Sequence, residues 1–267
     1  MTTLLHISDT HFGTEQPPVM AALAALAAQL SPDLLVLSGD ITQRARPAQF
    51  AAARRFVDRL ALPFVSIPGN HDLTVLNPLA RLLAPYRGYR RAFGDVLEPV
   101  HESAELLVQC VKTTRWWRHI EGEVSPAQVE RVARRLRRAR PEQLRVVVVH
   151  QPVHVEGQVE AKHLLRGRVA ALRSWAEAGA DVVLGGHIHL PGVAELTPQG
   201  ATGARIIVAQ AGTAVSSRVR RGVPNSVNVI RHDPAGAARC AIERWDFTAE
   251  RGVFQRVDTR DFELQRR

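Results

Sequence analysis

Short runs of apolar and β-branched residues alternate with longer segments of helical periodicity along most of this chain. The apolar runs predict strands at residues 3–8, 34–39, 64–69, 106–112, 145–150, 181–186, 205–212, 226–230 and 240–247. The helical pattern predicts helices over Pro18–Leu30, Pro47–Leu60, Pro126–Arg138 and Glu160–Ala178, and the first three begin with a proline. Because strands and helices alternate early and strands follow one another late, the pattern predicts a layered α/β fold with mixed sheets.

Several predicted strands are apolar at every position, as in the run "VVVV" at residues 146–149. A strand of this kind is buried on both faces. The chain contains no internal repeat, long linker or low-complexity tract. We therefore expect a single domain over residues 1–267, in which the C-terminal strands at about 205–247 complete the second sheet.

The charge of the chain is strongly positive, with 35 Lys and Arg against 26 Asp and Glu and a formal net charge of +9. Such a balance favours anionic partners. In the densest basic run, residues 129–145, the apolar positions Val129, Val132, Ala133 and Leu136 share one helix face, so the arginines are expected on a solvated face. Nucleic-acid binding stays open but is not favoured, since no aromatic residues are interleaved there. Peripheral contact with an anionic membrane and a homodimer also stay open.

The cysteines and the N-terminal segment argue against other classes of protein. Cys110 and Cys240 lie far apart, which supports neither a disulfide framework nor a thiolate metal site. No secretory signal pattern opens the chain, and its apolar Ala-rich segment is too short to span a membrane. We expect a soluble cytoplasmic protein.

Polar residues that can bind metal ions follow five of the predicted strands. Carboxyl ends of strands in open α/β sheets converge on a crevice, so these side chains are expected to meet there. Each residue alone has an ordinary explanation as a turn or capping residue, but five such strand ends together do not. The residues are Asp9 and His11, Asp40, Asn70 with His71 and Asp72, His150, and finally His187 and His189.

The mixture of carboxylate, imidazole and amide ligands suits divalent cations such as Mn²⁺, Fe²⁺ or Zn²⁺. The set is too large for one ion with an open position, and it suits two ions about 3.5–4 Å apart that share a carboxylate. Glycines before Asp40, Asn70 and His187 allow sharp turns close to the ions. His187 and His189 would then each serve a different ion of one pair.

The ordered motifs "DTH", "GD", "GNHD", "H" and "GHIH" between positions 9 and 189 resemble those of the calcineurin-like metallophosphoesterases. The resemblance covers about two-thirds of the chain and implies a four-layer α/β/β/α sandwich of two mixed sheets flanked by helices. It further implies one ion held by Asp9, His11 and His189, and a second held by Asn70, His150 and His187. Asp40 would bridge the two ions.

The same resemblance gives roles to the neighbours of Asn70. It implies that His71 acts on the phosphate or the leaving oxygen and that Asp72 orients the His71 ring. Within the family, the motif wording looks most like that of bacterial class III cyclic-nucleotide phosphodiesterases. The implied activity is hydrolysis of a small-molecule phosphodiester, with 3′,5′-cyclic nucleotides as the preferred substrates, by a hydroxide that bridges the ions.

Other functions use the same core and stay open. They are a hydrolase of lipid-linked diphosphates or pyrophosphates, a nuclease, a phosphoprotein phosphatase, and a non-catalytic module that binds a partner. The segment 85–122 matches no substrate motif. Ser216, Ser217 and Arg218 are candidate substrate contacts, whereas His163 is expected to be a solvated histidine.

Overall fold

The computed structural model describes residues 1–267 except 75–77, 119, 234–237 and 266–267. Its strands are β1 Thr2–Ile7, β2 Leu34–Leu37, β3 Phe64–Ser66, β4 Val100–Glu102, β5 Leu106–Cys110, β6 Leu144–Val148, β7 Val182–Gly185, β8 Gly192–Leu196, β9 Ile206–Gln210, β10 Ser226–Asp233, β11 Arg239–Thr248 and β12 Val253–Glu263. Its α-helices are α1 Pro17–Leu30, α2 Pro47–Leu60, α3 Pro78–Leu83, α4 Arg87–Phe93, α5 Pro126–Leu136 and α6 Arg168–Glu177. Two short 3₁₀ helices, η1 Asn70–Asp72 and η2 Gln158–His163, complete the described elements.

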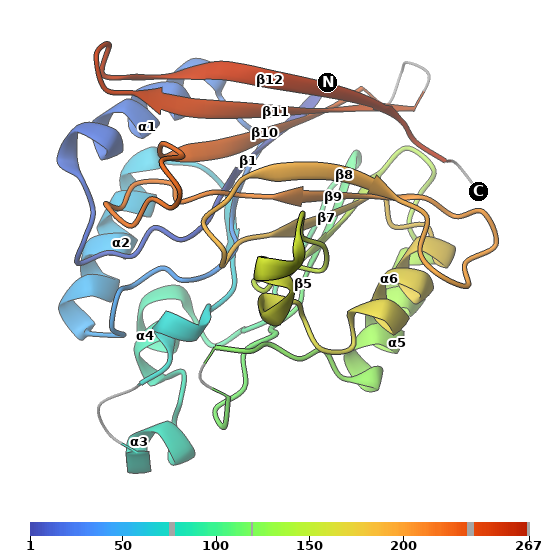
Figure 1. The fold of residues 1–267 in the computed structure, drawn as a ribbon, viewed down its shortest axis with the longest axis horizontal. Coiled ribbons are helices and arrows are strands. Elements are labelled where there is room, and N and C mark those ends of the chain that lie inside the picture. Colours follow the sequence, from blue (N-terminus) through green and yellow to red (C-terminus); the bar gives the residue numbers. More distant parts are fainter. Residues whose placement is uncertain (75–77, 119, 234–237, 266–267) are drawn as a thin grey trace.

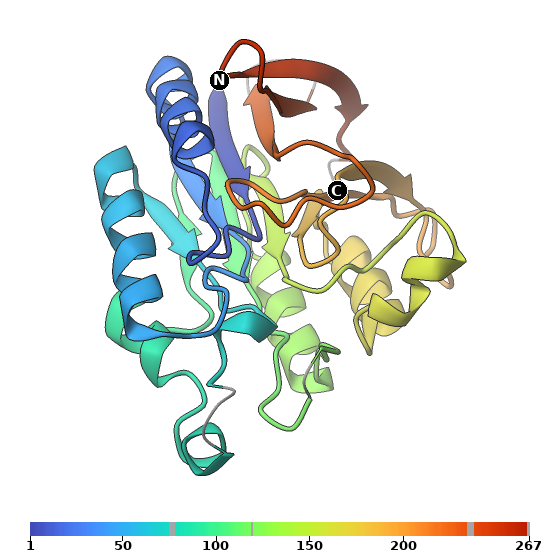
Figure 2. The same ribbon diagram turned by 60° about the vertical axis from the view of Figure 1, so that its left-hand side comes forward.

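Two six-stranded sheets face each other, with helices outside (Figure 1, Figure 2). The first sheet has the order β12-β11-β10-β1-β2-β3 and the second the order β4-β5-β6-β7-β9-β8. Strands β1, β2 and β3 are mutually parallel, and so are β5, β6, β7 and β9. The carboxyl ends of the parallel strands of both sheets lie at one edge of the molecule.

Alternation along the strands builds three apolar layers between and around the sheets. In β1, Leu4 points into the space between the sheets and Leu5 points to the outer helices. In β6, Val146 likewise points between the sheets and Val147 to the opposite helix layer. Helices α1 and α2 cover the first sheet, and α5 and α6 cover the second. The expected four-layer α/β/β/α sandwich is confirmed.

Helix α5 carries its basic residues as the sequence predicts. Ser125 caps its N-terminus by accepting a hydrogen bond from the Gln128 backbone N–H. Val132, Ala133 and Leu136 are buried against the second sheet, while the arginines of the helix point outward. Outward arginines pair with Glu98 and Glu130, which is the solvated face expected from the periodicity.

The pairing of the C-terminal strands differs from the sequence expectation. Of the strands expected over residues 205–247 to complete the second sheet, only β9 belongs to it, and β10 and β11 extend the first sheet. Strand β1 pairs with β2 along one edge, so its other edge is open for the antiparallel partner β10. This pairing joins the two ends of the chain, and a local apolar pattern does not encode such a distant partner.

Several short or polar elements were not predicted. Strands β4 and β8 and helices α3 and α4 are too short to show a clear period, and β12 is an edge strand of mostly exposed polar residues. The helix expected over Glu160–Ala178 is divided into η2 and α6. Gly167, with a φ of 84°, separates them as the residue before α6.

Cys110 and Cys240 are both buried. Within the part of the chain that the structure describes, no helix combines the length and the apolar character that crossing a bilayer requires.

Candidate dimetal centre

The predicted ligands gather where the parallel strands end. Asp9 follows β1, Asp40 follows β2, Asn70 opens η1 after β3, His150 follows β6, and His187 follows β7. The backbone there is unusual, because five of these side chains stand on residues with positive φ. The values are 52° for Asp9, 40° for His11, 48° for Asp40, 78° for His187 and 59° for His189. Residues other than glycine rarely adopt this region, and such strain gathers at functional sites.

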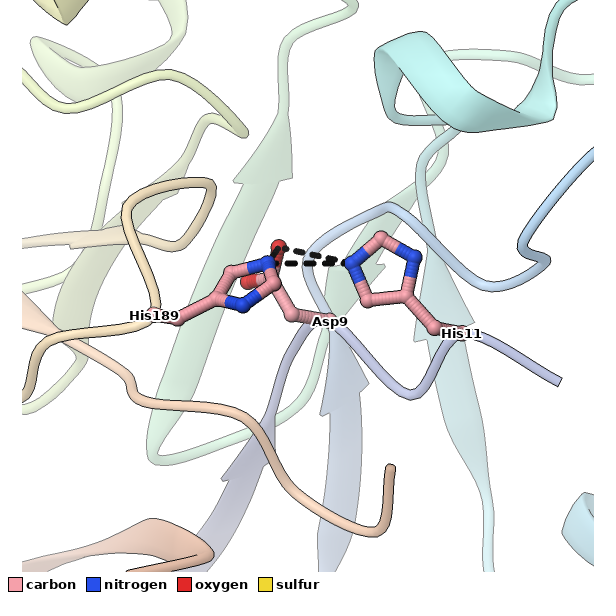
Figure 3. A group of neighbouring side chains, drawn as sticks. All are labelled: Asp9, His11 and His189. Atoms are coloured by element: carbon pink, nitrogen blue, oxygen red, sulfur yellow. Dashed lines mark hydrogen bonds and ion pairs between the residues drawn. The ribbon is translucent and has the colours of Figure 1, made fainter. Parts of the chain in front are cut away.

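The first group of ligands consists of Asp9, His11 and His189, whose ligand atoms lie within 4.8 Å of one another (Figure 3). The Nε2 atoms of His11 and His189 are 3.0 Å apart. His189 Nε2 is 3.2 Å from Asp9 Oδ1, and His11 Nε2 is 3.8 Å from the same oxygen. Imidazole nitrogens and a carboxylate that converge in this way have the donor set that Mn²⁺, Fe²⁺ and Zn²⁺ accept.

The second group consists of Asp40, His150 and His187, which also lie within 4.8 Å of one another. Asn70 joins this group, since its Oδ1 is 3.3 Å from His150 Nε2. His187 Nδ1 is buried and has no hydrogen-bond partner among the described residues. A buried nitrogen of this kind is expensive to leave unpaired, so it fits a site that a cation completes.

Backbone carbonyls hold the histidine rings in one orientation. His150 Nδ1 donates to Ser38 O at 2.8 Å, and His189 Nδ1 donates to Arg218 O at 2.6 Å. Because a carbonyl only accepts, each Nδ1 carries a proton, so in the neutral ring Nε2 is the atom that presents its lone pair to the site. Orientation of metal-binding histidines by such partners is a general property of metal centres.

Asp40 lies between the two groups. Its Oδ2 is 3.8 Å from His11 Nε2, and its Oδ1 is 3.3 Å from His150 Nε2. One carboxylate therefore has one oxygen directed to each group, which is the arrangement expected of a bridging ligand.

The pKa shifts at the site indicate which of its side chains are neutral and which are charged at pH 7. Burial lowers the pKa of His11 and of His187 to about 3, so both rings are neutral and can act as ligands at pH 7. Burial also opposes charge on His150, yet the nearby Asp40 carboxylate outweighs it and raises the pKa to about 9. Burial works against ionised Asp40 too, but His150 holds the Asp40 pKa well below its usual range. Without ions, His150 and Asp40 thus form a buried ion pair.

His71 lies at the site, but Asp72 does not orient it as expected. The His71 ring donates from Nδ1 to the Gln43 carbonyl at 2.9 Å. The Asp72 carboxylate instead accepts backbone hydrogen bonds from Ile41, Thr42 and Gly69, which ties the loop after β2 to the loop after β3. Burial, with repulsion from Asp40, raises the pKa of Asp72 to about 6. The resemblance implied that Asp72 orients the His71 ring; in this structure the carboxylate contacts backbone amides, and the ring is held by the Gln43 carbonyl.

Arg218 reaches the centre from the loop after β9. Its Nη1 donates to Gln43 Oε1 at 3.0 Å and lies 3.3 Å from His71 Nε2 and 3.4 Å from His11 Nδ1. The sequence indicated Arg218 only as one of three adjoining candidates, and no motif indicated Gln43. The Arg218 side chain thus stands between the first ligand group and His71.

His163 is a second residue that sequence reasoning misplaced. It was expected to be solvated, but its Nδ1 lies 3.1 Å from His187 Nε2. Glu160, on the same 3₁₀ helix η2, is 2.8 Å from Arg221 Nη2 and 3.0 Å from Arg220 Nη1. These ion pairs hold η2 against the loop that carries Arg218. No sequence motif surrounds His163, so its contact with His187 could not be predicted from the sequence.

The fold and the site together define a class of protein. Two facing sheets with outer helices, and two adjoining ligand groups at their shared edge, are the architecture of a dimetal phosphoesterase. Residues 2–191 match the family described as Calcineurin-like phosphoesterase, and the chain belongs to that family. The resemblance of the sequence motifs is thereby confirmed.

Known proteins similar to this chain include two bacterial phosphodiesterases. The chain is 39% identical over 92 residues to the Glycerophosphodiester phosphodiesterase GpdQ of Enterobacter lignolyticus, a match covering 28% of this chain and 33% of that protein. It is 42% identical over 79 residues to the Probable cyclic nucleotide phosphodiesterase syc0937_d of Synechococcus sp., covering 26% of this chain and 31% of that protein. The matches thus span about a third of either relative.

A solved dimetal phosphatase from Danio rerio has a TM-score of 0.65 with 12% identity and covers 99% of both chains. At this identity the likeness is one of fold.

Proposed function

We propose that this protein is a phosphodiester hydrolase that depends on two divalent cations. The observation that carries the proposal is the placement of Asp40, with one carboxylate oxygen directed to each ligand group. The donor set supports Mn²⁺, Fe²⁺ or Zn²⁺ in both positions. None of the seven ligands that the family motifs require is missing from the sequence, which speaks against a non-catalytic binding module.

The two groups of neighbouring side chains support one division of the proposed ligands between the cations. Asp9, His11 and His189 would hold one cation, and Asn70, His150 and His187 the other. Asp40 would contact both. When bound, two such cations lower the pKa of a water molecule and neutralise charge on phosphoryl oxygens.

Residues around the ligands supply the remaining chemistry. His71 would deliver a proton from Nε2 to the leaving oxygen, while its Nδ1 stays on the Gln43 carbonyl. The Arg218 guanidinium, 3.3 Å from that Nε2, would donate to a phosphoryl oxygen and hold the ester beside His71. Both roles need a substrate that exposes an anionic phosphate at the same edge of the sheets.

For the substrate we propose small-molecule phosphodiesters, with 3′,5′-cyclic nucleotides as the class to test first. The motif wording supports this choice, as does the partial similarity to proteins named as phosphodiesterases. A cytoplasmic location stays part of the same proposal.

The test is a phosphoester panel on purified protein supplied with Mn²⁺, Fe²⁺ or Zn²⁺ in turn. We expect hydrolysis of bis-p-nitrophenyl phosphate and of a 3′,5′-cyclic nucleotide, and loss of both activities after chelation. Activity on bis-p-nitrophenyl phosphate with intact 3′,5′- and 2′,3′-cyclic nucleotides would remove the substrate proposal alone. Preference for diphosphates, nucleic acid or phosphoprotein would select one of the alternative hydrolases. No hydrolysis of any phosphoester, with both ions bound, would refute the enzyme.

A further inference from the structure

Helix α3 turns its apolar face away from the protein. Leu79, Leu82 and Leu83 follow the i, i+3, i+4 spacing of one helix face, and they are 65%, 50% and 73% exposed. In a globular protein that face normally packs on a core. Figures 1 and 2 both show α3 as an outlying element below the sheets. Each of these leucines therefore leaves half or more of its surface open to solvent in the described structure.

A second segment extends this apolar surface. Arg81 donates from Nε to Trp116 O at 2.7 Å and from Nη2 to Arg118 O at 3.0 Å, which fixes the 116–118 turn beside α3. Trp116, Trp117 and Ile120 are 40%, 56% and 46% exposed. We call Leu79, Leu82, Leu83, Trp116, Trp117 and Ile120 the α3 patch. Every strongly exposed leucine, isoleucine and tryptophan of the described residues belongs to it; the other exposed large apolar residues are valines and Met1.

The two segments that carry the patch are basic. By sequence, residues 73–94 contain four arginines and no acidic residue, and residues 111–120 contain Lys112, Arg115 and Arg118 and no acidic residue. Among the described residues, none forms an ion pair with Arg81, or with the exposed residues Arg87, Arg90 and Arg91 of α4. Acidic residues border both segments: Asp72 and Asp95 flank the first, and Glu121 and Glu123, which pair with Arg118, follow the second.

We propose that the α3 patch docks the protein on an anionic lipid surface. Exposed leucines and tryptophans insert at the boundary between headgroups and acyl chains, and flanking arginines bind the anionic headgroups. A second copy of the chain fits this surface less well, because a symmetric contact would bring the same arginines together. Since α3 begins shortly after His71 and Asp72 on η1, docking would place the lipid surface near the segment that carries His71.

The test measures binding of full-length protein to vesicles, and it needs no turnover. Its failure is therefore separate from failure of the proposed function. We expect co-sedimentation with vesicles of phosphatidylcholine and phosphatidylglycerol, weakened by salt, and much less with phosphatidylcholine alone. Serine at positions 82 and 83 (L82S, L83S) should each lower partitioning about tenfold, because each removes roughly two inserted methylene equivalents. Val257→Ser on β12, where Val257 is 55% exposed, is the matched control and should bind like the parent.

A second variant isolates the electrostatic contribution. Arg87→Glu with Arg91→Glu should weaken binding to anionic vesicles and leave the melting temperature unchanged, since both side chains are exposed. Equal binding by the parent and the L82S/L83S protein would overturn the proposal, as would equal binding to neutral and anionic vesicles. A parent that ignores vesicles but dimerises through the patch, with dimers lost in L82S/L83S, would overturn it in favour of a second copy.

Discussion

Gly69 tests whether the loops after β2 and β3 must approach closely for the site to form. A Cβ added to Gly69 would stand 2.1 Å from the backbone N of Asp40 and 2.2 Å from its Oδ1. Packed carbon atoms tolerate nothing near this distance, so Gly69→Ala must displace one loop by about 1 Å. The displaced group is the carboxylate proposed to contact both cations, which also accepts a hydrogen bond from His71 N at 2.8 Å.

The expected losses are large for a single methyl group. Overpacking of this kind costs about 1–3 kcal/mol of folding free energy. A shift of about 1 Å at a catalytic group can lower turnover about 100-fold. The assays are thermal unfolding, elemental analysis of bound metal, and hydrolysis of bis-p-nitrophenyl phosphate, for Gly69→Ala beside Gly192→Ala. Gly192 has open space around its would-be Cβ, so that variant should behave like the parent. A Gly69→Ala protein with two ions per chain and full turnover would refute the reasoning.

Three further predictions concern the same centre. His71→Ala should keep the fold and both ions but lose about 10²–10⁴ of turnover; undiminished activity would exclude the proposed proton donor. Arg218→Met should lower kcat/KM about 10- to 100-fold with metal content unchanged, because a charged hydrogen bond to phosphate is lost; an unchanged kcat/KM would contradict that contact. For His150, the pKa raised from 6.5 to about 9 means that the ion-free protein is stabilised fully below pH 6.5 and loses this stability as pH rises through about 9. The melting temperature of chelated protein should therefore fall between pH 7 and pH 9, and a His150→Gln protein that falls as steeply would contradict the assignment.

Much of the fold follows from local sequence pattern because its central strands are buried on both faces. Runs such as Val146–Val149 are apolar at every position. Their side chains point alternately into the two apolar layers on either side of the sheet, and a buried strand is the structure that satisfies this pattern. That the candidate ligands gather at one edge was predictable for a related reason. Asp9, Asp40 and His150 each lie within three residues of the end of such a strand, and the carboxyl ends of parallel strands lie at one edge of a sheet.

Other features depend on contacts between distant segments. The partner of His71 is a backbone carbonyl, and any residue at position 43 would offer one. Arg218 reaches the site from a loop with no distinctive motif, and the pairing of β1 with β10 joins opposite ends of the chain. The leucines of α3 have the spacing of a core-facing helix, so their exposure is visible only in three dimensions.

The left-handed backbone conformation affects how the site would evolve if metal binding were lost. The residues concerned are Asp9, His11, Asp40, His187 and His189. Each residue costs about 1–2 kcal/mol that glycine would not, and binding of the proposed cations would offset this cost. A lineage that stops using the ions would gain folding stability by exchanging these residues for glycine or asparagine. Decay of this centre should therefore begin at these positions and leave His150 and Asn70 as its last traces.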